Sequence, residues 1–227
     1  MNALFKKILE KLKGNRFGLW PTFLRLIQKG GIPLLRGLRV KLIHPFKVNF
    51  PFYLGKGVRI HNTSFLITGK NVYIGDYSYM DCLSLGGVKL GNNVTIREFA
   101  WCQLTSSLSN PGELIEIGDN SYIGPRVVLG AAASLKIGSN CQIGSGVNFI
   151  AENHKFSGND DIFNQGVIRK GIVIGNDCWI GNNVIILDGI HVGDGAVIGA
   201  GSVVTKEVPR LAVVVGNPAK VMRFRNE

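Results

Sequence analysis

The chain has 227 residues, 45% of them hydrophobic, and a formal net charge of +11 at pH 7. This length allows one large domain or two modest ones, and the apolar fraction suffices for a core. No apolar run reaches the roughly 18 residues of a membrane-spanning helix, and lysines interrupt the N-terminal apolar segment, which argues against a signal peptide.

Residues 1–50 form a basic head. They contain eleven Lys and Arg and one acid, which gives +10, whereas residues 51–227 contain fifteen Lys and Arg and fourteen acids, which gives +1. The head either caps the body or a neighbouring subunit, or lies on an anionic membrane face. No aromatic-basic motif accompanies the charge, so nucleic acid is not an expected partner.

Two helices are expected in this head. Apolar residues at helical spacing from Leu4 to Leu12 predict an amphipathic helix that ends near Gly14. A second helix is predicted to begin at Pro21 and to be stopped by Gly30 and Gly31.

The body, residues 51–208, carries a six-residue repeat. Branched aliphatics recur at every sixth position, most regularly at Ile174, Ile180, Ile186, Val192, Ile198 and Val204. A period of six fits neither a helix nor an isolated strand, and it predicts a three-sided coil with three short strands per turn. The repeat begins near Ile74, and its interruptions at about 83–89, 104–116 and 130–136 are expected to be corners or small excursions. Residues 209–227 are expected to cap the coil.

Small residues two positions before these aliphatics suit inward positions beside a turn. They include Ser121, Cys141, Cys178, Ala196 and Ser202. Cys141 and Cys178 are therefore expected in the core and not as nucleophiles. The four cysteines (Cys82, Cys102, Cys141 and Cys178) form no C-x-x-C pair, which favours a reduced, cytoplasmic location. If the head binds membrane and does not only cap the coil, the expected place is the inner face of the cytoplasmic membrane.

Three motifs carry a resemblance to a known family. Residues 174–181 (IGNDCWIG), 198–206 (IGAGSVVTK) and 216–221 (GNPAKV) resemble hexapeptide-repeat acyltransferases, most closely the galactoside, maltose and polysaccharide O-acetyltransferase branch. The resemblance covers roughly residues 55–225. It implies an all-β fold, a left-handed parallel β-helix, assembled as a homotrimer with active sites in grooves between neighbouring coils.

A loop insertion at 150–171 interrupts the repeat for a whole coil, and long polar loops in solenoids are usually functional. The resemblance assigns His154 the role of general base, which takes a proton from a hydroxyl as it attacks a thioester. The alternative is a solvated histidine without a task. Glu152 and Asp81 are candidates to orient it, although Asp81 suits an outward corner equally well.

The same resemblance implies acetyl-CoA as the acyl donor. The candidate cofactor-binding residues are Trp179, Asn182, Ala200, Thr205, Lys206, Lys220 and Arg223. Trp179 precedes an inward aliphatic and is expected to point outward along the cofactor groove. The alternative is that it covers a seam between subunits. Cations near the last coil suit the phosphates of coenzyme A.

The expected acceptor is a saccharide hydroxyl of a cell-envelope polysaccharide such as O-antigen, capsule, lipopolysaccharide or exopolysaccharide, or of its precursor. An antibiotic or serine acceptor, and a non-catalytic scaffold, stay open as alternatives. A γ-type carbonic anhydrase would need three zinc-binding histidines, and the four histidines here lack such spacing, so no metal is expected.

Overall fold

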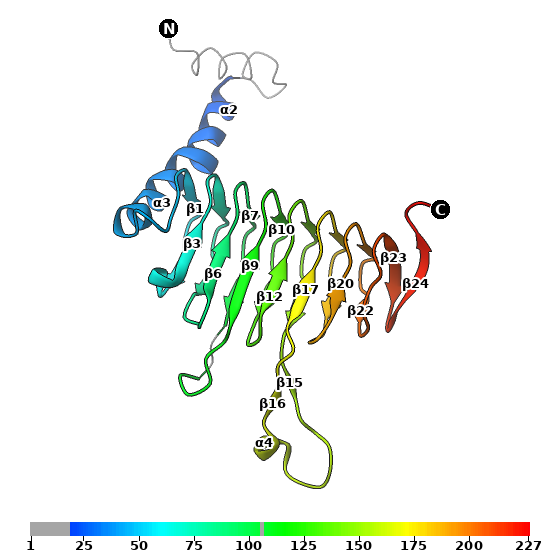
Figure 1. Ribbon diagram of the computed structural model, residues 1–227. Coiled ribbons are helices and arrows are strands. Elements are labelled where there is room, and N and C mark those ends of the chain that lie inside the picture. The colour runs from blue at the N-terminus through cyan, green and yellow to red at the C-terminus, as the bar shows by residue number, and fades with distance from the viewer. Residues whose placement is uncertain (1–18, 105–106) are drawn as a thin grey trace.

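Figure 1 shows a computed structural model of the chain, in which residues 19–104 and 107–227 are described. The described chain consists of an N-terminal helical segment, a long three-sided coil and a C-terminal hairpin. The helix predicted between Leu4 and Leu12 lies outside the described residues. No helix of the described part is long and apolar enough to cross a membrane.

The helical segment runs without a break through α2 (Leu19–Leu26), a π-helical turn η1 (Ile27–Gly31) and α3 (Ile32–Ile43). The predicted stop at Gly30 and Gly31 is therefore wrong. The Ile32 N–H donates to the Ile27 carbonyl, five residues back, and the wider turn lets Pro33 sit in the first turn of α3. A glycine inside a helix costs only about 1 kcal/mol, which packing of α3 on the coil offsets.

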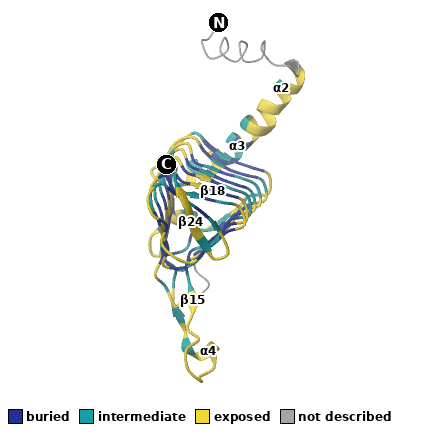
Figure 2. Cartoon of the chain, turned by 90° about the vertical axis from the view of Figure 1, so that its right-hand side faces the viewer, coloured by how far each residue is buried: buried dark blue, intermediate teal, exposed yellow. Residues whose placement is uncertain are grey.

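The coil passes in turn through three parallel sheets, which form the sides of a prism seen end-on in Figure 2. Sheet 1 contains β1 (Phe52–Leu54), β4 (Val72–Ile74), β7 (Thr95–Ile96), β10 (Tyr122–Ile123), β13 (Gln142–Ile143), β18 (Trp179–Ile180), β21 (Val197–Ile198), β23 (Ala212–Gly216) and β24 (Ala219–Phe224). Sheet 2 contains β2 (Arg59–His61), β5 (Tyr79–Asp81), β8 (Trp101–Gln103), β11 (Val128–Gly130), β14 (Asn148–Ile150), β19 (Ile185–Ile186) and β22 (Val203–Val204). Sheet 3 contains β3 (Leu66–Thr68), β6 (Gly87–Leu90), β9 (Leu114–Ile117), β12 (Leu135–Ile137), β17 (Ile172–Ile174) and β20 (His191–Val192), with a short 3-10 turn η2 (Thr63–Phe65) before β3.

The six-residue stride fills the interior of the prism. All six aliphatics between Ile174 and Val204 are at most 2% exposed, and the small residues Ser121, Cys141, Cys178, Ala196 and Ser202 are buried beside them. The predicted inward positions are confirmed. Because each short strand has its partner one coil away, every coil covers the strand edges of the next, and the core is continuous along the axis.

An asparagine ladder lines the corner between sheets 3 and 1. The side-chain amide of Asn71 donates to Asn93 (3.0 Å), Asn93 to Asn120 (2.9 Å) and Asn120 to Asn140 (3.3 Å). These four residues have φ between 57° and 60°, the left-handed region that asparagine tolerates better than most residues. The repeated turn thus explains the repeated residue type.

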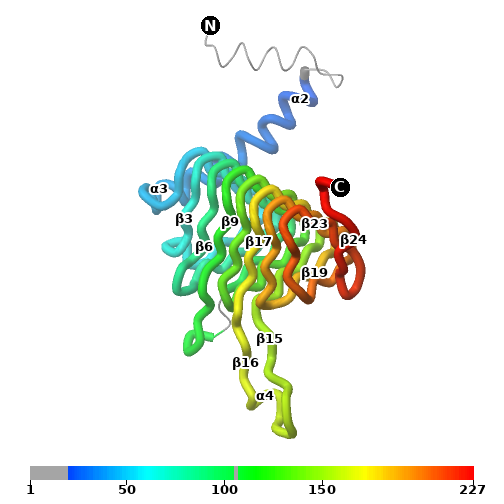
Figure 3. Tube along the Cα trace, turned by 45° about the vertical axis from the view of Figure 1, so that its right-hand side comes forward, coloured from blue at the N-terminus to red at the C-terminus, as the bar shows by residue number. Residues whose placement is uncertain are grey.

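Two long excursions of the described chain leave the same corner, between sheets 2 and 3 (Figures 1 and 3). One connects β8 to β9 and the other connects β14 to β17. The interruption predicted at 130–136 is a corner, one of the two forms expected there, because residues 131–134 connect β11 to β12 and β12 begins at Leu135. The interruption predicted at 83–89 is shorter than expected, since β6 already begins at Gly87.

The C-terminal segment ends sheet 1. β23 pairs in parallel with β21, and β24 then folds back antiparallel on β23. This hairpin covers the last coil of sheet 1, at the opposite end of the prism from α3.

Candidate active site

The loop between β14 and β17 is an antiparallel hairpin. Its stem consists of β15 (Asn153–His154) and β16 (Val167–Ile168), with His154 opposite Val167, and a short helix α4 (Ile162–Gln165) lies near its tip. Figure 3 shows the hairpin extending away from the prism edge. His154 therefore lies at the base of the excursion, next to the coil, and its side chain is exposed.

Arg169 fixes one side of this base. Its Nε donates to Glu152 Oε2 at 2.7 Å, and its Nη1 donates to Asn110 Oδ1 at 2.8 Å and to the Pro111 carbonyl at 3.3 Å. Asn110 and Pro111 belong to the other excursion, so one guanidinium ties the two excursions together. A charged hydrogen bond of this kind, with both side chains partly shielded, holds its partners more firmly than a fully exposed ion pair.

Asp188 fixes the end of the hairpin. Its carboxylate is buried and accepts the backbone N–H of Lys170 at 3.0 Å and of Gly171 at 2.8 Å, where the chain returns to β17. Asp188 and Arg169 were not among the site residues expected from sequence. The available signal was an acid in an otherwise aliphatic corner, Leu187-Asp188-Gly189-Ile190.

Replacing Asp188 by Ala is expected to leave two backbone N–H groups without their acceptor and to lower the free energy of unfolding by about 2–3 kcal/mol. The base of the hairpin should then loosen. Urea unfolding gives the stability change, and hydrogen exchange of residues 166–172 reports the local effect. Asp119→Ala is a matched control, since its carboxylate accepts from Asn92 at an exposed corner remote from the hairpin. Equal protection of residues 166–172 from hydrogen exchange in both variants would contradict the view that Asp188 fixes the end of the hairpin.

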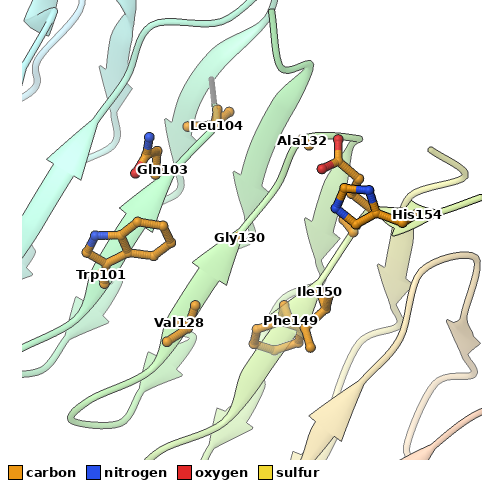
Figure 4. A pocket seen from close by; sticks show the side chains of 11 residues that line it. Trp101, Gln103, Leu104, Val128, Gly130, Ala132, Phe149, Ile150 and His154 are labelled. Carbon is orange, nitrogen blue, oxygen red and sulfur yellow. The ribbon is translucent and has the colours of Figure 1, made fainter. Parts of the chain in front are cut away.

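A cavity of about 480 Å³ lies on the outer face of sheet 2, under the base of the hairpin (Figure 4). Its lining residues are Trp101, Gln103, Leu104, Val128, Gly130, Ala132, Phe149, Ile150, Ala151, Glu152 and His154. Trp101, Val128 and Ile150 give it an apolar floor, and the polar groups of Gln103, Glu152 and His154 lie around it. A mostly apolar cavity with a few convergent polar groups is the usual form of a small-molecule site.

Gly130 contributes to the hollow by lacking a side chain. It occupies an outward position of β11, between Gln103 on β8 and Ile150 on β14 in the sheet register. A Cβ there would meet the Phe149 carbonyl oxygen at 3.2 Å, a tight contact that a small shift relieves. A larger side chain at this position would extend into the cavity.

The other expected catalytic residues are placed differently. Glu152 lines the same cavity as His154 but is hydrogen-bonded to Arg169, and the His154 imidazole makes no hydrogen bond to another described residue. Asp81 accepts the Asn62 side-chain amide at 2.8 Å and the Leu83 N–H at 3.1 Å. Its strand β5 is separated from β14 by β8 and β11, about 14 Å at ordinary strand spacing. One chain does not bring Asp81 to His154.

Four of the expected cofactor residues lie near the corner between sheets 1 and 2. Trp179 is 60% exposed on β18, and Asn182 and Ala200 occupy turns between sheets 1 and 2, where Asn182 Oδ1 accepts the Ser145 N–H at 2.8 Å. Lys220, exposed on β24, pairs with Val215 near this corner.

The remaining cofactor candidates lie elsewhere in the chain. Thr205 and Lys206 follow β22 at the corner between sheets 2 and 3, the corner from which the His154 hairpin leaves. Arg223, at the other end of β24, pairs with Val213. Within one chain, the width of sheet 2 therefore separates the Trp179 cluster from His154.

The cysteines are not arranged for nucleophilic catalysis. All four are buried and free. Burial, with Asp81 nearby, raises the pKa of the Cys82 thiol to about 12. The neighbouring Cys141 thiol, together with burial, raises the pKa of Cys178, whereas the Cys178 thiol lowers the pKa of Cys141. The Cys82 and Cys178 thiols are therefore protonated at neutral pH, and none of the four cysteines lines the cavity. Within residues 19–104 and 107–227, no three His, Cys, Asp or Glu side chains are grouped to hold a metal ion.

The repeats match known families. The family described as "Bacterial transferase hexapeptide (six repeats)" matches residues 171–206, and the family described as "Hexapeptide repeat of succinyl-transferase" matches residues 115–148. These segments carry the stride of buried aliphatics described above.

The chain is also similar to solved structures. A point mutant of AntD, an N-acyltransferase from Bacillus cereus, in complex with dTDP and coenzyme A, is 20% identical, with 82% of this chain and 89% of that chain covered and a TM-score of 0.54. A hexapeptide-repeat acetyltransferase from Vibrio cholerae O1 biovar eltor, complexed with acetyl coenzyme A, is 26% identical, with 74% and 71% covered and a TM-score of 0.48. The polySia-specific acetyltransferase NeuO is 27% identical, with 78% and 70% covered and a TM-score of 0.48. Residues 115–148 and 171–206 thus match hexapeptide-repeat families, and the chain shares its fold with the N-acyltransferase AntD.

Proposed function

We propose that this protein is an acetyl-CoA-dependent O-acetyltransferase that acts on a hydroxyl of a saccharide, of the kind found in cell-envelope polysaccharides or their precursors. The observation that carries the proposal is the position of His154 beside a cavity with an apolar floor and polar groups around it. The bacterial transferase repeat and the fold shared with AntD, which was determined with coenzyme A, support a left-handed β-helix and this donor.

In this proposal the His154 imidazole removes the proton of the acceptor hydroxyl while the oxygen attacks the thioester carbonyl. The new C–O bond forms, the C–S bond breaks, and the imidazolium returns the proton to the thiolate of coenzyme A. The cysteines are buried and none of them lines the cavity, which favours this direct transfer over an acetyl-cysteine intermediate. Trp101, 41% exposed on the cavity floor, offers an aromatic face against which a pyranose ring can pack.

A homotrimer completes this site. The Trp179 corner and His154 lie on different edges of one prism, so a single coenzyme A would contact both only where two subunits meet. A groove between subunits is also where the acceptor would lose water before transfer. Light scattering gives the subunit number, and mixing His154→Ala with Trp179→Ala chains tests the shared site, because mixed trimers regain some intact sites.

The acceptor class is tested by offering acetyl-CoA with sugars, nucleotide sugars, envelope glycans, serine and aminoglycosides, with release of free coenzyme A as the readout. Gly130→Leu is expected to lower kcat/KM for a saccharide by roughly tenfold to a hundredfold, because the new side chain occupies the cavity. The KM for acetyl-CoA should stay unchanged. Gly130→Ala, which adds a single methyl group, is the control. If Gly130→Leu leaves saccharide transfer unaltered, the acceptor binds elsewhere.

A further inference from the structure

One side of α3 is fixed against the first coil. Pro33 and Gly37 are buried one turn apart, and Val40 packs against the core one turn further along. A Cβ on Gly37 would collide with the carbonyl oxygen of Phe52 in β1. The helix therefore cannot rotate about its axis without losing this contact, and its opposite side faces away from the prism.

That opposite side is apolar. Leu35 is 67% exposed, Leu42 is 71% exposed, and Phe46, just beyond the helix, is 97% exposed. Leu38 lies between the two leucines at helical spacing and is also exposed. A surface helix ordinarily turns its apolar side inward, and a contiguous apolar patch on the surface marks an interaction site. We call Leu35, Leu38, Leu42 and Phe46 the outer apolar stripe.

Cations accompany the outer apolar stripe, and acids do not. Arg36 and Arg39 lie within one turn of its leucines, and neither forms an ion pair with a described residue, whereas residues 19–50 contain no Asp or Glu. Lys29 points toward the coil, where it lies 3.7 Å from both Asp76 and Glu98. Lys29 thus connects the helices to the coil, whereas Arg36 and Arg39 lie beside the outer apolar stripe without an ion pair to a described residue.

The preceding helix has the same character. In α2, Trp20 is 67% exposed and stacks on Phe23 with ring centroids 6.0 Å apart, and Arg25 is exposed. Figures 1 and 2 show α2 projecting from the N-terminal end of the prism, on the side opposite to the β15–β16 hairpin, with exposed residues along its length. Aromatic rings with nearby arginines are typical of helices that lie at a membrane interface.

We propose that α2 and α3 bind the surface of an anionic phospholipid bilayer, with the outer apolar stripe among the acyl chains and Arg36 and Arg39 at the lipid phosphates. No helix among the described residues can span a bilayer, so the segment lies in the interface. A second copy of this face is a poor occupant, since it would bring like charges together. Nucleic acid would pair with the arginines and leave the leucines exposed.

The test is co-sedimentation of the full-length protein with vesicles of phosphatidylcholine alone and of phosphatidylcholine mixed with phosphatidylglycerol. We expect binding to the anionic vesicles, weakened by salt. The pair Leu35→Gln/Leu42→Gln and the pair Arg36→Gln/Arg39→Gln should each lower the partition coefficient about tenfold or more. The controls are two matched double variants on sheet 3, which should bind vesicles like the unmodified protein. They are Ile67→Gln/Val173→Gln and Lys89→Gln/Lys136→Gln.

Three results would overturn the proposal. The first is equal binding to both vesicle types or an unchanged partition of the two test pairs. The second is that the Leu35→Gln/Leu42→Gln variant changes the oligomeric size but not vesicle binding, which would make the stripe a contact between subunits. The third is that DNA abolishes vesicle binding while the Leu35→Gln/Leu42→Gln variant still binds vesicles normally. Because the assay needs no acetyl transfer, its outcome is independent of the proposed function.

Discussion

Replacing His154 by Ala is expected to lower kcat for acetyl transfer by a factor of ~10²–10⁴, the usual contribution of a positioned general base. The KM for acetyl-CoA should hardly change, because the Trp179 cluster lies at a different corner of the prism. Steady-state assay of coenzyme A release, with the acceptor found in the panel above, measures both quantities.

His191→Ala is the matched control for this variant. His191 also points outward, but from β20 on sheet 3, away from the cavity, and its loss should leave kcat unaltered. Rapid-quench experiments with unmodified protein should show no burst of acetyl-enzyme, since the proposed transfer is direct. Activity that survives His154→Ala intact would mean that another group acts as the base and would contradict the proposed mechanism.

Replacing Phe149 by Ala is expected to lower the free energy of unfolding by about 3–5 kcal/mol. The Phe149 side chain is fully buried in β14, the strand that leads into the His154 hairpin, and its removal leaves a large void. Urea unfolding followed by circular dichroism measures the change at fixed protein concentration.

Phe163→Ala provides the comparison, because this residue lies in α4 of the hairpin and is 94% exposed. The free energy of unfolding of Phe163→Ala should lie within about 0.5 kcal/mol of that of the unmodified protein. Similar losses of unfolding free energy in both variants would contradict this expectation. They would mean that Phe163 is packed in solution and that Phe149 contributes no more to stability than a residue of the hairpin. The pair separates the stability of the coil from that of its excursion.

The stride of buried aliphatics could be predicted from sequence because it is a local rule repeated many times. The six-residue spacing starts again after each corner, so it holds from Ile174 to Val204. A wrong assignment in one coil therefore does not affect the assignment of the next. The His154 excursion was visible for the same reason, as a loss of that rhythm. Gly30 and Gly31 misled the prediction, because the cost of glycine in a helix is small beside the contacts α3 makes with β1.

The contacts that hold the site could not be predicted in this way. Arg169 reaches Asn110 across 59 residues of sequence, and Asp188 accepts N–H groups from the far end of a hairpin. Such pairs depend on which corners stack above one another. That stacking follows from the number of residues in each coil, which varies along the chain. The division of the cofactor candidates among different corners of the prism likewise follows from how the chain is wound and not from any motif.

The antiparallel turn of β24 has a consequence for association. A parallel coil ends in a row of unpaired amides and carbonyls that matches the beginning of any identical coil, and stacked solenoids could therefore grow end to end as filaments. By reversing direction beside β23, the last strand presents the opposite polarity to an incoming chain. On sheet 1, therefore, β24 opposes this end-to-end growth at one end of the prism, and α3 packs against β1, the first strand of the same sheet, at the other end.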